Sequence, residues 1–238
     1  MATALHAFDQ IYIINLPTRQ DRREEMVEQL ARAGLTLDDP KVTLFPAVRP
    51  NDPEPFDRVG VRGAFLSHLG VLKEAKAKGH GQILILEDDA DFTQALLSAD
   101  DEIIERLYAP GWDMAYLGHL VTGPAPSPSG EAFDPVLAPT PIMLAHALCI
   151  RTKALEGLIP YLEAMLARPA GDPAGGPMHV DGAYGWFRKD HPDITTLISR
   201  DQLIVQRASK TDVPAPRWKA KLPFINMARR LKNKLAQR

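Results

Sequence analysis

The stretch QILILEDDADF, at residues 82–92, constrains the fold of this chain more than any other. Its aliphatic run, 83–86, is too apolar for a strand with one face in water, which predicts a strand buried on both faces. Such strands occur in parallel sheets that helices cover on both sides. Three consecutive acids, Glu87, Asp88 and Asp89, follow the run directly. The stretch therefore predicts an α/β fold with clustered negative charge at the end of a central strand.

The residues before this strand alternate between short apolar runs and segments with helical periodicity. Residues 11–16 and 42–48 are short and rich in β-branched side chains, which predicts two strands. A helix is indicated between them, because apolar side chains recur at helical spacing from Met26 onward. Asp21 can cap this helix at its start, and Gly34 can end it.

A Pro-rich segment at 49–60 is expected to be a loop, and a second helical pattern follows over 62–81. The resulting order is strand, helix, strand, helix, strand. This order is typical of a mostly parallel, Rossmann-like sheet flanked by helices. The sequence shows no internal repeat.

Composition narrows the class of protein. The chain has 238 residues, of which 45% are hydrophobic and 24% charged, as in an ordinary globular domain. Its net charge of −2 gives no general attraction to nucleic acid. The single cysteine, Cys149, excludes an internal disulfide and suits a reducing compartment. The sequence shows neither a secretory signal at its start nor an apolar run near the ~20 residues of a membrane span. A cytoplasmic location is expected.

The acid cluster indicates a metal site. Ligands of open α/β sheets bind just outside the carboxyl ends of the strands, where these acids are expected to lie. A single aspartate there could simply form a turn, but three adjacent acids repel one another unless a positive charge lies among them. Mg²⁺ and Mn²⁺ commonly take one or two carboxylates and fill their other positions with phosphates and water. The cluster therefore suggests a metal–diphosphate site, although the spacing leaves open which acids touch the metal.

Three blocks of the sequence resemble glycosyltransferase family 25. They are IYIINLPTRQDRREEM at 11–26, GAFLSHLGVLKEA at 63–75 and ILILEDDADF at 83–92. Later segments, including MHVDGAYG at 178–185 and IVQRASKTDV at 204–213, match more loosely. The resemblance implies a GT-A-like fold that binds a nucleotide-sugar donor. It implies one domain over residues 1–216, with a nucleotide-sugar and metal half at 1–120 and an acceptor half at 121–216.

The resemblance also assigns roles to the acids. Glu87 and Asp89 are expected to hold Mn²⁺ or Mg²⁺, with Asp89 as the direct ligand and Asp88 on the sugar hydroxyls or the ribose. The other donor-binding residues that it implies are Asn15, Arg19, Asp21, Arg22, Ser67 and His68. Arginines can pair with a diphosphate through two hydrogen bonds, and the start of a helix favours anions.

Purely structural roles are the alternatives for some of these residues. Arg22 could form a solvated ion pair, and His68 could be a packed histidine that holds the acidic loop in place. Three departures from the family pattern also occur. Ala64 stands where cysteine is usual, Thr211-Asp212 replaces Ser-Asp, and the Pro-rich segment 122–141 fits no motif. The Pro-rich segment leaves the identity of the acceptor open, because enzymes of this kind differ mainly in the loops that bind the acceptor.

The resemblance implies an inverting reaction, which needs a base to take the proton of the acceptor hydroxyl. We predict Asp181 as this base and His179 as its neighbour on the same face of an extended segment. Tyr184 and Trp186 could stack on a sugar. Alternatively, Asp181 caps a helix that begins near Gly182. His119 follows a probable strand and is a further candidate for the cleft.

The last segment, 217–238, is rich in Lys and Arg, lacks Asp and Glu, and carries an apolar side. This composition predicts either peripheral contact with the inner face of a membrane or a helix docked on the domain.

Together these features predict a metal-dependent hexosyltransferase that moves a sugar, with galactose favoured, from a UDP-sugar to a glycan or glycolipid such as lipopolysaccharide. The alternatives are a nucleotidyl or phosphoryl transferase that uses the same acidic site and a non-catalytic glycan-binding relative.

Overall fold

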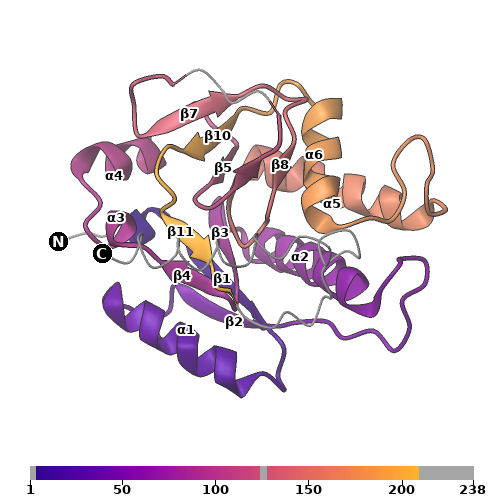
Figure 1. Cartoon of the computed structure of the whole chain (residues 1–238), viewed down its shortest axis with the longest axis horizontal. Helices are drawn as coiled ribbons and strands as arrows, with labels where there is room; N and C mark the ends of the chain where they lie inside the picture. Colours follow the sequence, from indigo (N-terminus) through magenta and orange to yellow (C-terminus); the bar gives the residue numbers. More distant parts are fainter. Residues whose placement is uncertain (1–3, 124–127, 209–238) are drawn as a thin grey trace, which may run out of the picture.

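The computed structural model describes residues 4–123 and 128–208 of the chain (Figure 1). Two sequence-based predictions concern residues outside these ranges: the basic segment 217–238 and the pair Thr211-Asp212. The Pro-rich segment 122–141 is described in part.

A seven-stranded sheet forms the centre of the molecule, in the strand order β2-β1-β3-β9-β5-β10-β7 (Figure 1). Its strands are β1 (Gln10–Asn15), β2 (Val42–Pro46), β3 (Gln82–Glu87), β5 (Met114–Tyr116), β7 (Phe133–Val136), β9 (Ala147–Arg151) and β10 (Thr196–Ser199). Two short antiparallel pairs lie outside this sheet. They join β4 (Ala90–Phe92) to β11 (Ile204–Gln206), and β6 (Leu120–Val121) to β8 (Ile142–Met143).

The central sheet is mostly parallel, as predicted. β1 pairs in parallel with β2 and β3, and β10 pairs in parallel with β5. β9 lies antiparallel between β3 and β5, so β5 runs in the same direction as β3. Only β9 and β7 run against the other five strands. The sheet passes without interruption through both predicted halves of the domain, and the division into donor and acceptor halves stays a prediction.

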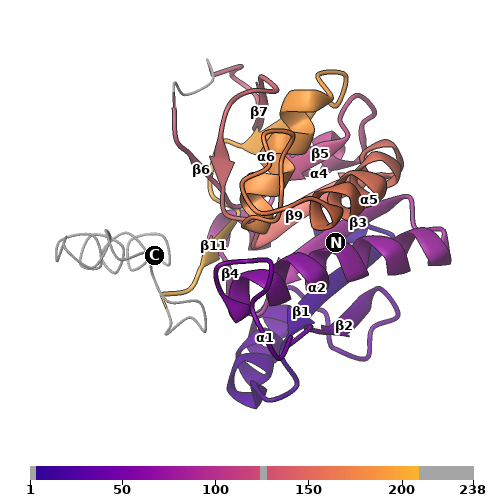
Figure 2. The same ribbon diagram turned by 90° about the vertical axis from the view of Figure 1, so that its right-hand side faces the viewer.

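Helices cover both faces of the sheet, as Figures 1 and 2 show from two sides. The helices are η1 (Ala4–Ala7, 3-10), α1 (Gln20–Arg32), α2 (Val59–Lys78), α3 (Gln94–Leu97), α4 (Asp101–Tyr108), α5 (Thr152–Ala167) and α6 (Val180–Asp190). α2, α5 and α6 lie on one face, and η1, α1, α3 and α4 lie on the other.

The buried strands divide their side chains between two apolar cores. In β3, Ile83 and Ile85 belong to the core under α2, α5 and α6, whereas Leu84 and Leu86 belong to the core under α1 and α4. This alternation follows from the two-residue period of a strand. It explains why the run 83–86 contains no polar residue.

The first helix starts two residues earlier than a cap at Asp21 would require. α1 begins at Gln20 with Arg19 at its N-cap, and the Arg19 side chain makes no capping hydrogen bond. Asp21 therefore lies inside the first turn, and its prediction as the cap is wrong. Gly34 ends the helix as predicted: its φ is 75°, and the N–H of Leu35 donates to the carbonyl of Leu30 at 2.9 Å.

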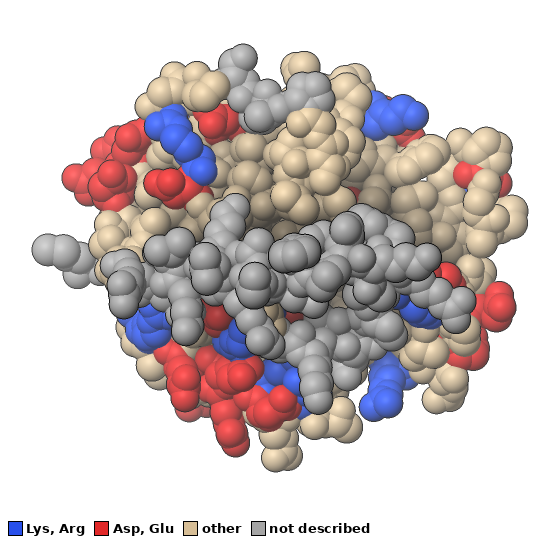
Figure 3. Space-filling view, viewed as in Figure 1, with Lys and Arg blue, Asp and Glu red and all other residues tan. Residues whose placement is uncertain are grey.

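The outer side of α1 carries acidic side chains, which gather at the bottom of Figure 3. Arg22 differs from its neighbours because it points inward and is only 8% exposed. In residues 4–123 and 128–208, no helix has both the length and the hydropathy needed to cross a bilayer.

Candidate active site

A cavity of about 580 Å³ opens where β1 and β3 end. Acids from the end of β3, arginines from two separate loops and the first turns of α2 line it. The lining residues that carry charge or can hydrogen-bond through a side chain are Thr18, Arg19, Arg22, Arg49, Arg58, Ser67, His68, Glu87, Asp88, Asp89, His179 and Gln206. The predicted position of the acids, at the carboxyl end of a central strand, is therefore where a cavity lies.

Asp88 joins the end of β3 to the beginning of the chain. Its Oδ2 accepts a 2.8 Å hydrogen bond from the side-chain amide of Asn15, the last residue of β1. Its Oδ1 lies 2.5 Å from Nη1 of Arg22, which α1 carries. Both partners are buried, so the ion pair is largely desolvated. The Asn15 and Arg22 side chains therefore orient Asp88 from behind, and Asn15 itself does not line the cavity.

Asp89 has much weaker compensation for its charge. It is only 3% exposed, and its Oδ1 has no hydrogen-bond partner among the described residues. Its Oδ2 accepts a long 3.4 Å bond from the amide of Gln206 and lies 3.8 Å from Nη1 of Arg22. Burial and then the charge of Glu87 raise the pKa of Asp89 to about 7. The site thus contains a buried carboxyl group whose neighbouring cation, Arg22, lies closer to Asp88 than to Asp89.

Glu87 is held by two aromatic residues in series. Nε2 of His68 lies 3.5 Å from Oε1 of Glu87, and Nδ1 of His68 lies 3.0 Å from the hydroxyl of Tyr184 on α6. Burial works to raise the pKa of Glu87, but the neighbouring His68, His146 and Arg22 side chains lower it overall. Glu87 is therefore kept ionised beside Asp89.

Tyr184 is fully buried in this arrangement. Its prediction as a stacking platform for a sugar is wrong, because its ring packs edge-on against His68 inside the protein. The contact with Tyr184 also shows that His68 is a packed residue that connects α6 to the acidic loop. His68 lines the cavity as well.

The end of the described chain closes the acid cluster from the other side. β11 pairs with β4, which follows the acids directly, with Gln206 opposite Ala90. The N–H of Arg207 donates to the carbonyl of Asp89 at 2.7 Å. The Arg207 guanidinium contacts Asp91 and also reaches Glu25 on α1. The loose resemblance of residues 204–213 to a family segment was the only sequence signal for this contact.

The carboxylates of Glu87 and Asp89 are suitable ligands for a hard divalent cation, which prefers oxygen atoms. Asp89 offers a buried oxygen without a partner, and Glu87 offers an ionised carboxylate at the same cavity. Within the described ranges, no group of three or more His, Cys, Asp or Glu side chains is arranged to hold a metal ion by itself. Mg²⁺ and Mn²⁺ do not need such a group, since substrate phosphates and water complete their coordination.

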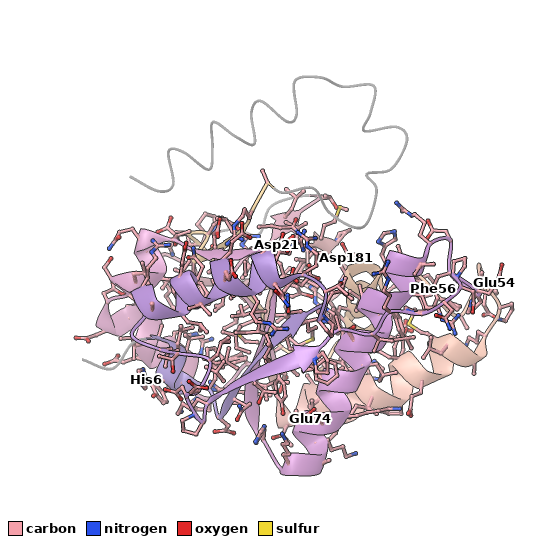
Figure 4. The ribbon with its side chains drawn as sticks, turned by 90° about the horizontal axis from the view of Figure 1, so that it is seen from below. His6, Asp21, Glu54, Phe56, Glu74 and Asp181 are labelled. Atoms are coloured by element: carbon pink, nitrogen blue, oxygen red, sulfur yellow. The ribbon has the colours of Figure 1, made fainter. Side chains whose placement is uncertain are left out.

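The N-terminal block places its charged residues unevenly. Arg19 lines the cavity, and its Nη2 lies 2.7 Å from Oδ2 of Asp21. Asp21 is exposed and does not line the cavity, and its hydrogen bond with Arg19 lowers its pKa to about 2. Figure 4 labels Asp21 and Asp181 on the upper side of the coloured part of the molecule, whereas Glu74 lies at the lower end of α2.

Two further arginines at the cavity were not predicted. Arg49 and Arg58 flank the Pro-rich segment between β2 and α2, which the sequence indicated only as a loop. Nη2 of Arg58 lies 3.2 Å from Nε2 of His179, so the loop meets the start of α6 at the cavity. The sequence signal that could have identified these two residues is an arginine at each end of a proline-rich loop.

Ser67 fixes this loop to α2. Its hydroxyl donates to the carbonyl of Gly63 at 2.7 Å and accepts from the N–H of Val48 at 2.8 Å. A side chain at Gly63 would bring its Cβ within 2.6 Å of the Val48 carbonyl, so the close approach requires glycine. Ser67 therefore shapes the cavity wall as well as lining it.

The predicted catalytic pair lies on α6, with its two members at different cavities. His179 is the N-cap residue of α6 and lines the large cavity. Asp181 is the second residue of the helix and lines a separate cavity of about 330 Å³ together with Trp186. α6 begins at Val180, so Asp181 is not its cap, although its Oδ1 accepts from the N–H of Gly182 at 2.8 Å.

His119 lines neither cavity. Its Nε2 lies 2.9 Å from the carbonyl of Ser199, and its N–H donates to the side chain of Gln202. Burial lowers the pKa of His119. Its prediction at the cleft is not supported by this position.

Comparisons with known proteins point to one family. The inactive glycosyltransferase 25 family member 3 of Homo sapiens is 30% identical over 135 residues, which cover 49% of this chain and 23% of that protein. Procollagen galactosyltransferase 1-B of Xenopus laevis is 34% identical over 136 residues, covering 47% of this chain and 21% of the relative. The chain thus spans less than a quarter of the length of these relatives. No family model matches the sequence.

The fold has a counterpart among solved structures. A glycosyltransferase involved in the glycosylation of the major capsid of PBCV-1 superposes with a TM-score of 0.52 at 12% identity, over 85% of this chain and 93% of that chain. This likeness confirms the predicted GT-A-like α/β fold. The relatives above confirm the predicted resemblance of the chain to the glycosyltransferase 25 family, by sequence over about half of its length.

Proposed function

We propose that this chain is a metal-dependent glycosyltransferase. It transfers a hexose, with galactose favoured, from a UDP-sugar to a cell-surface glycan or glycolipid such as lipopolysaccharide, with inversion at the anomeric carbon. Galactose is favoured because several of the similar proteins are named procollagen galactosyltransferases. Nucleic acid is not among the partners proposed.

The buried carboxyl group of Asp89 is the observation that carries the proposal. An acid whose pKa is raised to about 7 lies at a cavity that arginines also line. Neither the sheet nor the helices need such a charge, and its Oδ1 has no partner within the described residues. Perturbed acids of this kind in a cleft are typical of functional sites.

The arrangement of charge suits a nucleoside diphosphate. Arg19, Arg49 and Arg58 can donate hydrogen bonds to phosphate oxygens, and Arg22 and Asn15 keep Asp88 in one orientation. Bound at Asp89 and Glu87, Mn²⁺ or Mg²⁺ would supply positive charge next to the diphosphate as it leaves. His68 and Tyr184 hold Glu87 in place for this role.

The acceptor hydroxyl must lose a proton during transfer. Asp181 remains our proposal for the base, and His179 is the alternative because it lines the large cavity. The two residues are separated by a single position in the sequence, at the start of α6.

A second candidate function has its own support. Several of the similar proteins are named as inactive or probable inactive members of the glycosyltransferase 25 family. A chain of this kind would bind a nucleotide sugar or a glycan without consuming it.

One experiment separates the candidates. The purified protein is incubated with Mn²⁺ and a panel of nucleotide sugars, and the released nucleoside diphosphate is followed with and without EDTA. A glycosyltransferase releases it slowly from one donor without acceptor and faster with acceptor. Binding without release would support the non-catalytic candidate. Turnover of nucleoside triphosphates alone would support a nucleotidyl or phosphoryl transferase.

Two variants make the result specific to the site. Asp89→Asn removes the proposed metal ligand with little change in shape and should abolish the metal-dependent release. Glu74→Gln is the matched control, because Glu74 lies at the far end of α2, does not line the cavity and forms an ion pair with Lys78. Equal activity in Asp89→Asn and Glu74→Gln would refute the proposed site.

A further inference from the structure

The smaller cavity, of about 330 Å³, lies between α6 and the segment that leads into β8. Ligand cavities in proteins span about 300–1,000 Å³, so this one suits a single ring. Its lining residues are Pro139, Thr140, Pro141, Ile142, Met143, Asp181, Gly182, Gly185, Trp186 and Lys189. The set combines apolar walls, one aromatic ring, one acid and one base.

Trp186 supplies the aromatic surface of this cavity. Nζ of Lys189 lies 4.9 Å from the centroid of the indole ring. The ring is also held from the side of Gly175, where a Cβ would come within 3.1 Å of Cε3. The indole is therefore fixed in orientation, whereas the exposed Lys189 side chain can swing from the ring to a bound hydroxyl group.

Asp181 supplies a fixed hydrogen-bond acceptor in the same cavity. Its Oδ2 accepts from the N–H of Leu144 at 3.2 Å, and its Oδ1 accepts from the N–H of Gly182. Each carboxylate oxygen can accept a further bond from a ligand. Leu144 has a φ of 76°, in the left-handed region that a leucine rarely adopts. Backbone in this conformation is often found at ligand sites, and here Asp181 holds it in place.

The first turn of α6 joins the two cavities. His179 lines the large cavity and Asp181 lines the small one, although a single residue separates them in the sequence. Sugar transfer needs the donor and the acceptor to meet at one point, and this turn is where the two cavities come closest along the chain.

We infer that the smaller cavity binds one pyranose ring of the acceptor glycan. The apolar face of the ring stacks on Trp186, and its hydroxyl groups donate to Asp181 and accept from Lys189. This inference rests on the proposed function, because it names the acceptor subsite of that reaction.

NMR tests the inference directly, in the full-length protein and without nucleotide or metal. The probes are methyl β-galactopyranoside and methyl β-glucopyranoside, with sorbitol as a polyol that has no ring face. The indole N–H signal of Trp186 is assigned by its loss in Trp186→Phe. At least one glycoside should shift this signal saturably, and sorbitol should not.

The variants are chosen to separate stacking from folding. Trp186→Ala should weaken glycoside binding at least about tenfold, whereas Trp186→Phe, which keeps an aromatic face, should stay within about threefold of the wild type. Asp181→Asn should also weaken binding. Tyr108→Ala is the control, because Tyr108 is an exposed aromatic residue at the end of α4 that lines neither cavity.

The outcomes distinguish this inference from the proposed function. Absence of a saturable shift with glycosides up to about 100 mM, where even a weak complex is populated, would overturn the inference. Equal glycoside binding in Trp186→Ala and Tyr108→Ala would overturn it as well. If glycosides bind at Trp186 while no nucleotide sugar releases its diphosphate, the subsite stands and the proposed transfer reaction fails.

Discussion

The side-chain amide of Asn15 donates a 2.8 Å hydrogen bond to Asp88, so the ends of two neighbouring parallel strands are joined above the sheet. The contact links the first and third sequence blocks that resemble the family. Arg22 completes it from α1 with an ion pair to the other oxygen of Asp88. The three residues form one buried polar unit. In it, Arg22 balances the negative charge of Asp88, and Asp88 accepts a hydrogen bond from Asn15.

Asp88→Ala should therefore be costly to stability. The substitution removes the closer of the two carboxylates beside the buried Arg22 guanidinium, and breaking a buried pair in this way destabilises a protein by about 3 kcal/mol or more. Urea unfolding followed by circular dichroism measures the change. Asp21→Ala is the control, because Asp21 forms its pair with Arg19 in water. A similar midpoint for the two variants would contradict the importance of the buried unit.

Asp89→Asn should remove the response of the protein to metal. Binding of Mn²⁺ to the folded state alone raises its melting temperature, and this rise depends on ligand concentration. We expect a rise for the wild type in the presence of a nucleoside diphosphate and none for Asp89→Asn. Differential scanning fluorimetry with Mn²⁺ and then excess EDTA makes the comparison. A full response in the variant would exclude Asp89 as a ligand.

The free energy of unfolding of the metal-free protein should also depend on pH through Asp89. The folded-state pKa of Asp89 is about 7, above its ordinary value of 3.8. Below pH 3.8 the group is protonated in both states and contributes nothing. As the pH rises from about 4 to 7, the unfolded state ionises first, so the folded state loses stability, on the order of a few kcal/mol.

Asp89→Asn should abolish this loss. The stability of the variant relative to the wild type should increase from pH 4.5 to pH 7.5 in EDTA, because asparagine does not titrate. The difference between the two proteins reports the joint titration of Asp89 and Glu87, because the charge of Glu87 contributes to the raised pKa of Asp89. Parallel stability curves over this range would show that the pKa of Asp89 is not raised.

Asp181→Asn should lower turnover by roughly a hundredfold or more if Asp181 is the base. An amide cannot take the proton, but it keeps one oxygen for the N–H of Gly182 or of Leu144. Donor affinity should stay near the wild-type value, because Asp181 does not line the large cavity. Steady-state kinetics with varied acceptor measures the effect. Turnover within a few-fold of the wild type would move the role to His179.

Deletion of residues 217–238 should release the protein from anionic vesicles. The segment carries many Lys and Arg and no Asp or Glu, so its attraction to anionic lipid should weaken with salt. Vesicle co-sedimentation at low and high salt tests this, with slow hydrolysis of a soluble donor as the check that the remaining protein is folded. Full-length protein that ignores anionic vesicles at low salt would leave the docked-helix alternative.

The N-terminal part of the fold could be predicted because its signals are local. The apolar run 83–86 needs both faces buried, and the helix before it shows its own periodicity. The positions of β9 and β7 could not be predicted in the same way. β9 inserts between β3 and β5 in the antiparallel direction, and this order depends on pairing between residues that are far apart in the sequence.

The candidate site shows the same division. The acids and Arg22 could be predicted, because a charge cluster next to a buried strand stands out in any sequence. Arg58 and Gln206 could not, because the first reaches the cavity through a proline-rich loop and the second through the strand pairing of β11 with β4. The burial of Tyr184 also escaped prediction, since only the three-dimensional packing places His68 beside it.

The pairing of β11 with β4 also has a consequence for how the protein is made. Asp89 and Arg22 emerge from the ribosome early, but Gln206 and Arg207 follow more than a hundred residues later. Domains generally fold as units during synthesis. The acid cluster can therefore be completed only after nearly all of the described chain has been translated, and a fragment that ends before β11 should not reproduce the charge balance of the finished site.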